Sequence, residues 1–274
     1  MTDAPYALSA SGLIKNFGGL IATNNVSLNL KKGARHALIG PNGAGKTTFV
    51  NLLTGVLRPS TGSIHLDGRD ITKLSIHERS ARGLVRTFQI NQLFETLSPL
   101  ETLAAVVSER NGLGARIWQL LGTDPGIIER CHELLEQFRL LDVMDRPTKQ
   151  LPYGKRRQLE IAIALACNPR VLLLDEPVAG VPANERGVLL DIIDALPKDI
   201  SILLIEHDMD LVFSFATRIT VLVNGSLLME ADPHTVSNDP RVKEVYLGQG
   251  SVHKQRANQD AGPAQPKQSE VLYA

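Results

Sequence analysis

Nine residues of this chain form a complete phosphate-binding motif. They run from Gly40 to Thr48 and read Gly-Pro-Asn-Gly-Ala-Gly-Lys-Thr-Thr. Residues 34–39 before the motif predict a short buried strand, and residues 47–53 predict the first turns of a helix. In that setting the main-chain N–H groups of the loop and the positive end of the helix dipole form a nest for the β- and γ-phosphates. We therefore predict that the chain binds a nucleotide.

Side chains of the same loop would add to the main-chain amides. Lys46 would place a positive charge beside the phosphates, and the Thr47 hydroxyl can ligate Mg²⁺. A glycine-rich turn that binds nothing is the alternative, but it would not need a strand before it and a helix after it. We assign nucleotide binding to seven residues: Asn42, Gly43, Ala44, Gly45, Lys46, Thr47 and Thr48.

A second motif places two acids at the end of a strand. Residues 171–174 are all apolar and predict a central buried strand, and Asp175 and Glu176 follow directly. Ligands of open α/β sheets bind at the carboxyl ends of the strands. Asp175 is therefore predicted to contact Mg²⁺ either directly or through one of the groups that ligate it, and Glu176 to act as the base for the water that attacks the γ-phosphorus. A solvated turn is the alternative, which the phosphate loop in the same chain disfavours.

Two further polar residues follow apolar stretches in the same way. His207 closes the stretch that begins at Ile202, so its position parallels that of the two acids and favours a γ-phosphate contact over a capping role. Gln89 comes soon after the apolar residues 84–85. Gln89 follows the phosphate loop and precedes the two acids and His207 along the chain. This order predicts that Gln89 is a ligand of Mg²⁺ or of water, at a hinge into a helical lobe.

Composition and charge exclude some classes of protein. Lys plus Arg and Asp plus Glu both number 29, so no nucleic-acid partner is expected. No run approaches 18 apolar residues, and residues 1–5 lack a basic, apolar signal. We expect a soluble, cytoplasmic chain that reaches a membrane only through a partner. Cys131 and Cys167 have neither metal-ligand nor disulfide spacing and predict buried structural thiols.

The first third of the chain predicts β-structure beside the phosphate loop. Residues 8–38 are β-rich, with clean alternation at 26–30, and residues 63–68 predict another short strand that ends in a turn. We expect these segments to form a small antiparallel sheet that packs beside the nucleotide core.

The rest of the chain predicts a helical lobe and then alternating helices and strands. Ser98 to Glu101 form a capping box at a helix start. One apolar helical face consists of Ile127, Ile128, Cys131, Leu134, Leu135, Phe138 and Leu141. Helices near 156–167 and 183–196 alternate with strands at 171–174 and 200–205, and Asn224-Gly225 predicts a hairpin. The predicted fold class is α/β: a P-loop NTPase core with a mainly parallel sheet, a small antiparallel β subdomain and a helical subdomain.

Taken together, these motifs resemble the ATP-binding subunits of ABC transporters over about residues 8–248. The family's A-loop, Walker A, Q-loop, signature, Walker B and H-loop match, in order, Phe17, Gly40–Thr48, Gln89, Leu151–Lys155, Asp175–Glu176 and His207. The resemblance implies that ATP is the nucleotide and that Phe17 stacks on adenine. It also implies an ATPase domain at 7–248 with a helical subdomain inserted at about 90–155. Residues 249–274, which are poor in apolar residues, are predicted to be a disordered tail.

The resemblance also implies partners. Each ATP would lie between the Walker A of one subunit and the signature of a second, where Gly154 would contact the partner's ATP. Closure of the dimer would drive two membrane permease subunits at the cytoplasmic face of the membrane. A heterodimer is expected, and a homodimer is the alternative.

Within the family, four stretches are similar to the branched-chain amino acid subgroup: 13–19, 85–89, 159–162 and 238–248. This similarity implies solute import and an indirect periplasmic or extracellular solute-binding protein. Alternatives are the ATPase of a urea, amide or lipopolysaccharide system, or an ABC ATPase outside transport. The last usually carries two nucleotide domains or a long coiled coil. A regulatory subunit without turnover is disfavoured by Glu176 and His207.

Two prolines depart from the family pattern. Pro152 stands where the signature usually has a serine, whose hydroxyl and N–H would face the partner's γ-phosphate, and proline has neither donor. Pro182 stands where the loop after Walker B usually has an aspartate. Gly154 is retained, and Lys155 and Arg156 add positive charge nearby. We hypothesise an asymmetric heterodimer in which this chain lends its partner a weakened signature; the alternative is that Pro152 is neutral.

Overall fold

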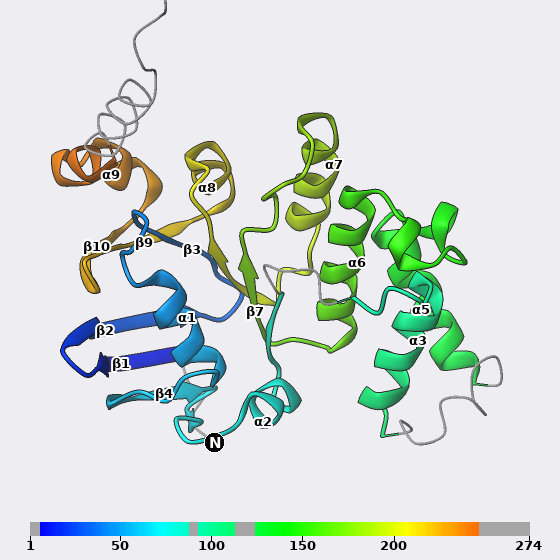
Figure 1. The fold of residues 1–274 in the computed structure, drawn as a ribbon, viewed down its shortest axis with the longest axis horizontal. Helices are drawn as coiled ribbons and strands as arrows, with labels where there is room; N and C mark the ends of the chain where they lie inside the picture. The colour runs from blue at the N-terminus through cyan, green and yellow to red at the C-terminus, as the bar shows by residue number, and fades with distance from the viewer. Residues whose placement is uncertain (1–5, 88–92, 113–123, 247–274) are drawn as a thin grey trace, which may run out of the picture.

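The computed structural model describes residues 6–87, 93–112 and 124–246. In Figure 1 a small sheet lies at the lower left, a larger sheet runs through the centre, and a group of helices lies to the right. Gln89 and the predicted tail at 249–274 lie outside the described residues. None of the helices in the described part of the chain combines the length and the apolar character needed to span a bilayer.

The small sheet is antiparallel, as the alternation predicted. Its strand order is β2-β1-β4-β5. Val26, Leu28 and Leu30 of β2 are buried, whereas the residues between them are exposed, because successive side chains of a strand point to opposite faces. The strands are β1 (Tyr6–Phe17), β2 (Leu20–Lys31), β4 (Thr61–Leu66) and β5 (Arg69–Asp70).

The central sheet is parallel except at one edge. Its order is β10-β9-β3-β8-β7-β6, and only β10 is antiparallel to its neighbour. Asn224 and Gly225, with φ of 49° and 75°, form the predicted hairpin between β9 and β10. Every residue of β7 and β8 is buried. The strands are β3 (Arg35–Ile39), β6 (Leu84–Arg86), β7 (Val171–Asp175), β8 (Ser201–Ile205), β9 (Arg218–Val223) and β10 (Ser226–Ala231).

The helices agree with the predicted order, with small shifts at their ends. α6 begins three residues before the predicted 156, because Pro152 at the N-cap has a φ of −53° that suits a helix start. The helices are α1 (Lys46–Thr54), α2 (Ile76–Ala81), α3 (Pro99–Arg110), α5 (Pro125–Gln137), α6 (Tyr153–Ala166), α7 (Ala183–Asp194), α8 (Met209–Phe215) and α9 (Pro233–Asn238), with 3₁₀ turns η2 (Leu141–Val143) and η3 (Thr148–Gln150).

The capping box at the start of α3 is confirmed. The Ser98 hydroxyl accepts from the Glu101 amide at 3.2 Å, and the Ser98 amide donates to the Glu101 carboxylate at 2.8 Å. Cys131 is buried in α5, whereas Cys167 at the end of α6 is only half-buried, and both thiols are free.

The predicted apolar face of α5 is wrong at two positions. Ile128 and Leu141 are 48% and 38% exposed, whereas the other five members of the face are buried. Ile128 is displaced from Ile127 by about 100° around the helix axis and turns toward solvent. Leu141 lies in η2, after Arg139 has taken a left-handed φ of 52°, so the helical period no longer applies to it.

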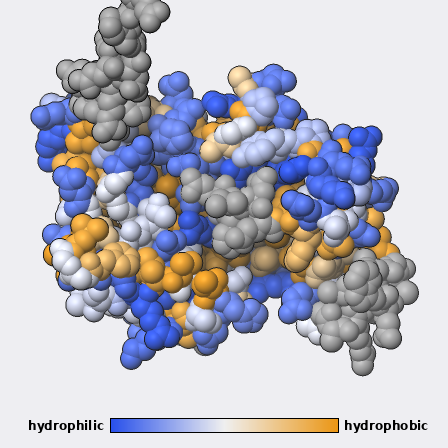
Figure 2. Space-filling view, in the orientation of Figure 1, coloured by the Kyte–Doolittle hydropathy of each residue, from blue (hydrophilic) through white to orange (hydrophobic). Residues whose placement is uncertain are grey.

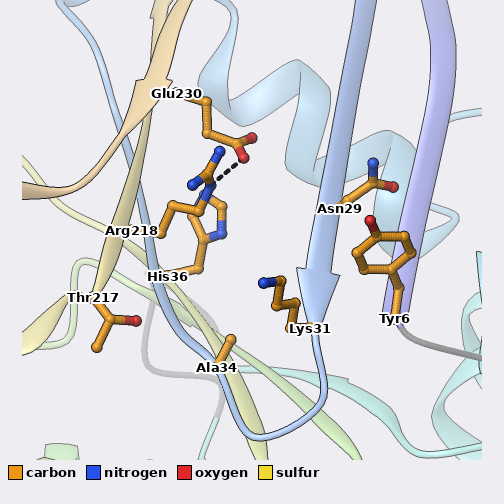
Figure 3. A pocket seen from close by; sticks show the side chains of 8 residues that line it. All are labelled: Tyr6, Asn29, Lys31, Ala34, His36, Thr217, Arg218 and Glu230. Atoms are coloured by element: carbon orange, nitrogen blue, oxygen red, sulfur yellow. Dashed lines mark hydrogen bonds and ion pairs between the residues drawn. The ribbon is translucent and has the colours of Figure 1, made fainter.

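A polar network lies at the amino-terminal edge of the central sheet, and Figure 3 shows two of its members, His36 and Glu230. His36 Nε2 lies 2.7 Å from the Thr220 hydroxyl, which donates to Glu230 Oε2 at 3.1 Å. Because the single hydroxyl proton is used on Glu230, His36 Nε2 carries the proton of a neutral ring. Burial lowers the pKa of His36 to about 4, although Glu230 opposes the shift and Arg218 adds to it. A cavity of about 490 Å³ separates this network from Tyr6, Asn29 and Lys31 of the small sheet.

The neutral His36 ring predicts a loss of stability in acid. Between pH 6.5 and about 4 the unfolded chain binds a proton that the folded chain refuses, so the free energy of unfolding falls as the pH falls. The full effect of this side chain is on the order of 3 kcal/mol. Urea unfolding at pH 7 and pH 4.5 measures it. His36→Gln, which cannot ionise, should remove this share of the pH dependence, and His132→Gln on the exposed side of α5 should not. Equal pH slopes for wild type and His36→Gln would contradict the assignment.

Candidate active site

The phosphate loop joins the end of β3 to the start of α1, as the motif predicted. Gly45 has a φ of 92°, and a Cβ there would lie 2.5 Å from the Ala22 carbonyl oxygen of β2. The Ala44 carbonyl accepts the Gly225 amide at 3.0 Å, and the Gly225 carbonyl in turn accepts the Asn24 amide at 2.7 Å. The loop is therefore held in shape by the backbones of β2 and the β9–β10 hairpin.

A cavity of about 650 Å³ opens over this loop. Its walls include all seven residues predicted to bind nucleotide, together with Glu176. Among the described residues no side chain caps the start of α1, so the amides of its first turn are available to an anion. The cavity, the open helix start and the left-handed glycines fit the phosphates of a nucleotide.

Five wall residues of the cavity were not predicted: Leu20, Ile21, Ala22, Asn224 and Gly225. Leu20 and Ile21 are large apolar side chains that are mostly exposed, on the tip of the β1–β2 hairpin. Figure 2 shows apolar surface at the lower left of the molecule, the side on which the small sheet lies in Figure 1. Apolar groups beside a phosphate site suit a flat aromatic base. In the sequence, these two residues appear only as apolar residues of a β-rich segment, and that pattern does not indicate which cavity they line.

Phe17 lies at the rim of this region and not in the described cavity wall. Its ring is 47% exposed, and the Lys15 ammonium lies 5.1 Å from the ring centroid. Its Cα pairs with that of Leu20, which does line the cavity. Adenine stacking on Phe17 stays a prediction.

Lys46 is held at the entrance to the loop. Its Nζ donates to the carbonyl oxygens of Gly40 at 2.5 Å and Pro41 at 3.0 Å. Burial lowers the pKa of Lys46, while the negative charges of Glu176 and Asp175 act against the shift. The ammonium therefore lies within the field of both acids at the end of β7.

The two adjacent acids occupy different environments. Glu176 has a left-handed φ of 47°, its amide donates to the Ile205 carbonyl at 2.9 Å, and its side chain lines the cavity. Asp175 is buried and is not among the described residues of the cavity wall. Its Oδ2 is bonded to Arg86 Nη2, a partner that the sequence did not indicate. The strand end therefore presents Glu176 to the cavity and keeps Asp175 beneath it.

His207 faces Glu176 from the neighbouring strand. Its Nδ1 lies 3.7 Å from Glu176 Oε1, and its side chain is 65% exposed. Glu206, which sequence reasoning missed, is fully buried and accepts the amides of His207 at 2.9 Å and Asp208 at 3.3 Å. Burial raises the pKa of Glu206, against these amide bonds. A buried acid at the end of an apolar strand was the signal that could have found it.

The signature segment lines a different cavity, of about 360 Å³. Gly154 lies in the first turn of α6, and a Cβ there would lie 2.0 Å from Glu185 Oε2. Lys155 Nζ donates to Asp142 Oδ1 at 2.7 Å, and Arg156 Nη2 donates to the Lys149 carbonyl at 2.5 Å. Both cations are thus engaged within the chain, and the side chain nearest to Gly154 in space is an acid.

The residues predicted to hold Mg²⁺ are only partly placed. Thr47 lines the cavity, Asp175 lies below it, and Gln89 is outside the described residues. Within the described ranges no three His, Cys, Asp or Glu side chains gather as a metal site. This composition fits Mg²⁺, which proteins bind with one or two side chains plus the substrate's phosphates. The assignment of Thr47, Asp175 and Gln89 as residues that would hold the ion stays a prediction.

Known proteins share this architecture. The sequence pattern of the ABC transporter family matches residues 23–179. BraF of Pseudomonas aeruginosa, a high-affinity branched-chain amino acid transport ATP-binding protein, is 38% identical over 88% of this chain and 98% of its own. LivG of Salmonella typhimurium, with the same description, is 39% identical over the same shares. A solved ATP-binding cassette of an ABC transporter in its ADP conformation has a TM-score of 0.76 at 30% identity, over 88% of this chain and 98% of its own.

The chain therefore belongs to the ABC transporter family, among its ATP-binding cassettes. The resemblance read from the motifs is confirmed, and so is the predicted α/β fold class. The roles given to single residues of the site stay predictions.

Gly45 allows a direct test of the loop geometry. Gly45→Ala should cost on the order of 2 kcal/mol of stability, because the left-handed φ is strained and the new methyl meets the Ala22 carbonyl. Nucleotide affinity should fall as the loop distorts. Thermal unfolding with and without ATP measures both effects. Gly19→Ala, where a Cβ meets nothing within 4 Å, is the matched control and should change neither. An unchanged ATP-induced shift in Gly45→Ala would contradict this role of the loop.

Proposed function

We propose that this ATPase subunit of an ABC transporter powers the import of branched-chain amino acids. The observation that carries the proposal is the cavity in which the phosphate loop and Glu176 face each other. The substrate class is supported by the relatives BraF and LivG, which are branched-chain amino acid transport ATP-binding proteins and whose similarity extends over 88% of this chain. Urea, amide and lipopolysaccharide systems remain the alternative substrates that the experiment below tests.

The site residues would divide the reaction among them. Loop amides and Lys46 bind the β- and γ-phosphates, and Thr47, Asp175 and Gln89 would hold Mg²⁺, which would neutralise charge on those phosphates. Glu176 accepts a proton from water as the water oxygen bonds to the γ-phosphorus and the bond to the β–γ bridging oxygen breaks. His207 orders the γ-phosphate.

A second ATP-binding subunit would complete each site. Gly154 and the phosphate loop line separate cavities in one chain, so a signature from a partner must supply the missing wall. Glu185 lies against Gly154 and would have to turn away before a partner's γ-phosphate could approach, because two negative groups repel at that distance. Pro152 replaces the usual serine of the signature and cannot donate a hydrogen bond to the partner's γ-phosphate. This replacement supports a heterodimer with unequal sites.

The permease would dock on an apolar groove of about 200 Å³ between α1, α2, β6 and α6. Val56 and Ile76 are largely exposed at its edge, and apolar exposure of this kind is typical of contact sites. We propose that a cytoplasmic segment of one of the two permeases binds here and holds the chain at the cytoplasmic face of the membrane, while the other permease contacts the second ATP-binding subunit. A solute-binding protein would act on the permeases from the other side. The apolar wall residues of the groove are Val56, Ile76, Leu84, Val85, Ile163, Ala164 and Cys167.

Reconstitution tests the function and the role of Glu176 together. In vesicles that hold the permeases and enclose ATP on the side of this chain, the wild-type complex should take up labelled leucine, isoleucine and valine supplied outside with the solute-binding protein, and should not take up urea. Glu176→Gln should bind ATP with wild-type affinity, because the loop is untouched, while hydrolysis falls at least ~10²-fold and uptake stops.

Glu136→Gln on the solvent side of α5 is the matched control and should retain full activity. Sustained hydrolysis by Glu176→Gln would refute its role as base. Uptake of urea in place of branched-chain amino acids would refute the substrate class and leave the ATPase assignment intact.

Pro152→Ser tests the proposed asymmetry of the two sites. The new hydroxyl and amide would each be able to donate to a partner's γ-phosphate, and a net gain of about 1 kcal/mol would raise hydrolysis in the complex roughly fivefold. Steady-state hydrolysis by the reconstituted complex is the measurement. Pro197→Ser, at an exposed loop position, controls for the loss of a proline. Unchanged hydrolysis in Pro152→Ser would show that Pro152 is neutral.

A further inference from the structure

The guanidinium of Arg86 joins three elements of the site. Arg86 is the last residue of β6, and its side chain is only 12% exposed. Nη2 is bonded to Oδ2 of Asp175 at the end of β7, and Nη1 donates to Oδ1 of Asn51 in α1 at 2.7 Å. One planar group therefore ties the acid strand to the helix that begins at the phosphate loop.

The register of the two strands fixes this contact. Arg86 is opposite Leu173 in the parallel β6–β7 pair, so its side chain reaches along β7 to Asp175 two residues further on. Thr87 strengthens the pairing, because its amide donates to the Leu173 carbonyl at 2.9 Å and its hydroxyl accepts the Asp175 amide at 3.3 Å. The backbone on which Arg86 and Asp175 stand is thus held at both positions.

The chemistry of the contact favours arginine over lysine. Arginine presents several donors in a rigid fork and can bind Asp175 and Asn51 at once, whereas the ammonium of lysine is a compact point charge. Arg86 Nε is buried without a hydrogen-bond partner among the described residues. The position of the side chain therefore leaves one of its own donors unsatisfied. Its two satisfied nitrogens are the two that fix Asp175 against α1.

We propose that Arg86 is a positioning residue that sets the orientation of the Asp175 carboxylate toward α1 and thereby sets the affinity of the site for Mg²⁺ with its nucleotide. The proposal rests on the proposed function, in which Asp175 holds the ion. Arg86 acts through Asp175 and Asn51, and not by contact with the reacting atoms. It also lines the apolar groove between α1, α2, β6 and α6, so the same side chain touches both the acid and the proposed permease contact.

The test separates binding of the ion from folding. Binding of a fluorescent ATP analogue to the full chain is titrated with and without Mg²⁺, in the Glu176→Gln background that prevents turnover. Arg86→Lys should reduce the Mg²⁺-dependent gain in affinity about tenfold, as loss of a residue behind a metal ligand usually does. Affinity without Mg²⁺ should stay within about twofold, because the loop amides are unchanged.

Asn51→Ala is the milder second variant, in case Arg86→Lys does not fold. It removes one arm of the fork and should reduce the Mg²⁺ gain by a smaller factor. The double variant should be no worse than Arg86→Lys alone, because both changes break one network. Arg170→Lys is the matched control: its exposed ion pair with Asp67 lies just before β7, and the Mg²⁺ gain should not change.

Two outcomes overturn the proposal. If Arg86→Lys and Asn51→Ala lower the unfolding temperature and leave the Mg²⁺ gain intact, Arg86 is a structural tie only. If the Mg²⁺ gain rises, Arg86 competes with the ion for Asp175 and does not position it. Failure of the proposed role of Asp175 as an ion ligand is a different result: Asp175→Ala in the Glu176→Gln parent would then leave the Mg²⁺-dependent gain in affinity unchanged.

Discussion

The site depends on main-chain contacts that fix the phosphate loop from outside. The loop is short and rich in glycine, so it has little stiffness of its own. The Ala22 carbonyl lies so close to Gly45 that no side chain fits there, and the Ala44–Gly225 hydrogen bond closes the other side. The amides can therefore point in one direction before any ligand arrives, and binding need not order them. The small antiparallel sheet matters to the site because its strand β2 holds the phosphate loop in this conformation.

The ionisable side chains at the carboxyl edge of the central sheet differ in how deeply they are buried. Glu176 lines the cavity and His207 faces it from the end of the neighbouring strand, while Asp175 and Glu206 are buried. Each buried acid has its own partners: Asp175 is paired with Arg86, and Glu206 accepts two main-chain amides. Partners of this kind reduce the cost of burying a carboxylate, although burial still raises the pKa of Glu206.

The two segments that the proposed function assigns to an ATP site lie on different parts of the same chain. The phosphate loop opens beside β2 and the β9–β10 hairpin, whereas Gly154 lies at the start of α6 against Glu185 of α7. The phosphate loop and the Gly154 segment therefore cannot enclose one nucleotide within a single chain. For this reason the proposed function includes a second subunit. Arg86 contacts Asp175 and also lines the apolar groove between α1, α2, β6 and α6.

Local patterns were enough to determine the strand–loop–helix at Gly40–Thr48, the buried strand before Asp175 and the Asn224-Gly225 hairpin, because each depends on neighbours along the chain. They also gave the fold class, since continuous apolar strands alternating with helices build a parallel sheet. Tertiary structure alone decided that Leu20 and Ile21 line the nucleotide cavity, that Arg86 binds Asp175 and that Glu185 covers Gly154. Those contacts join residues on separate elements, and no spacing along the sequence encodes which side chains meet when the elements pack.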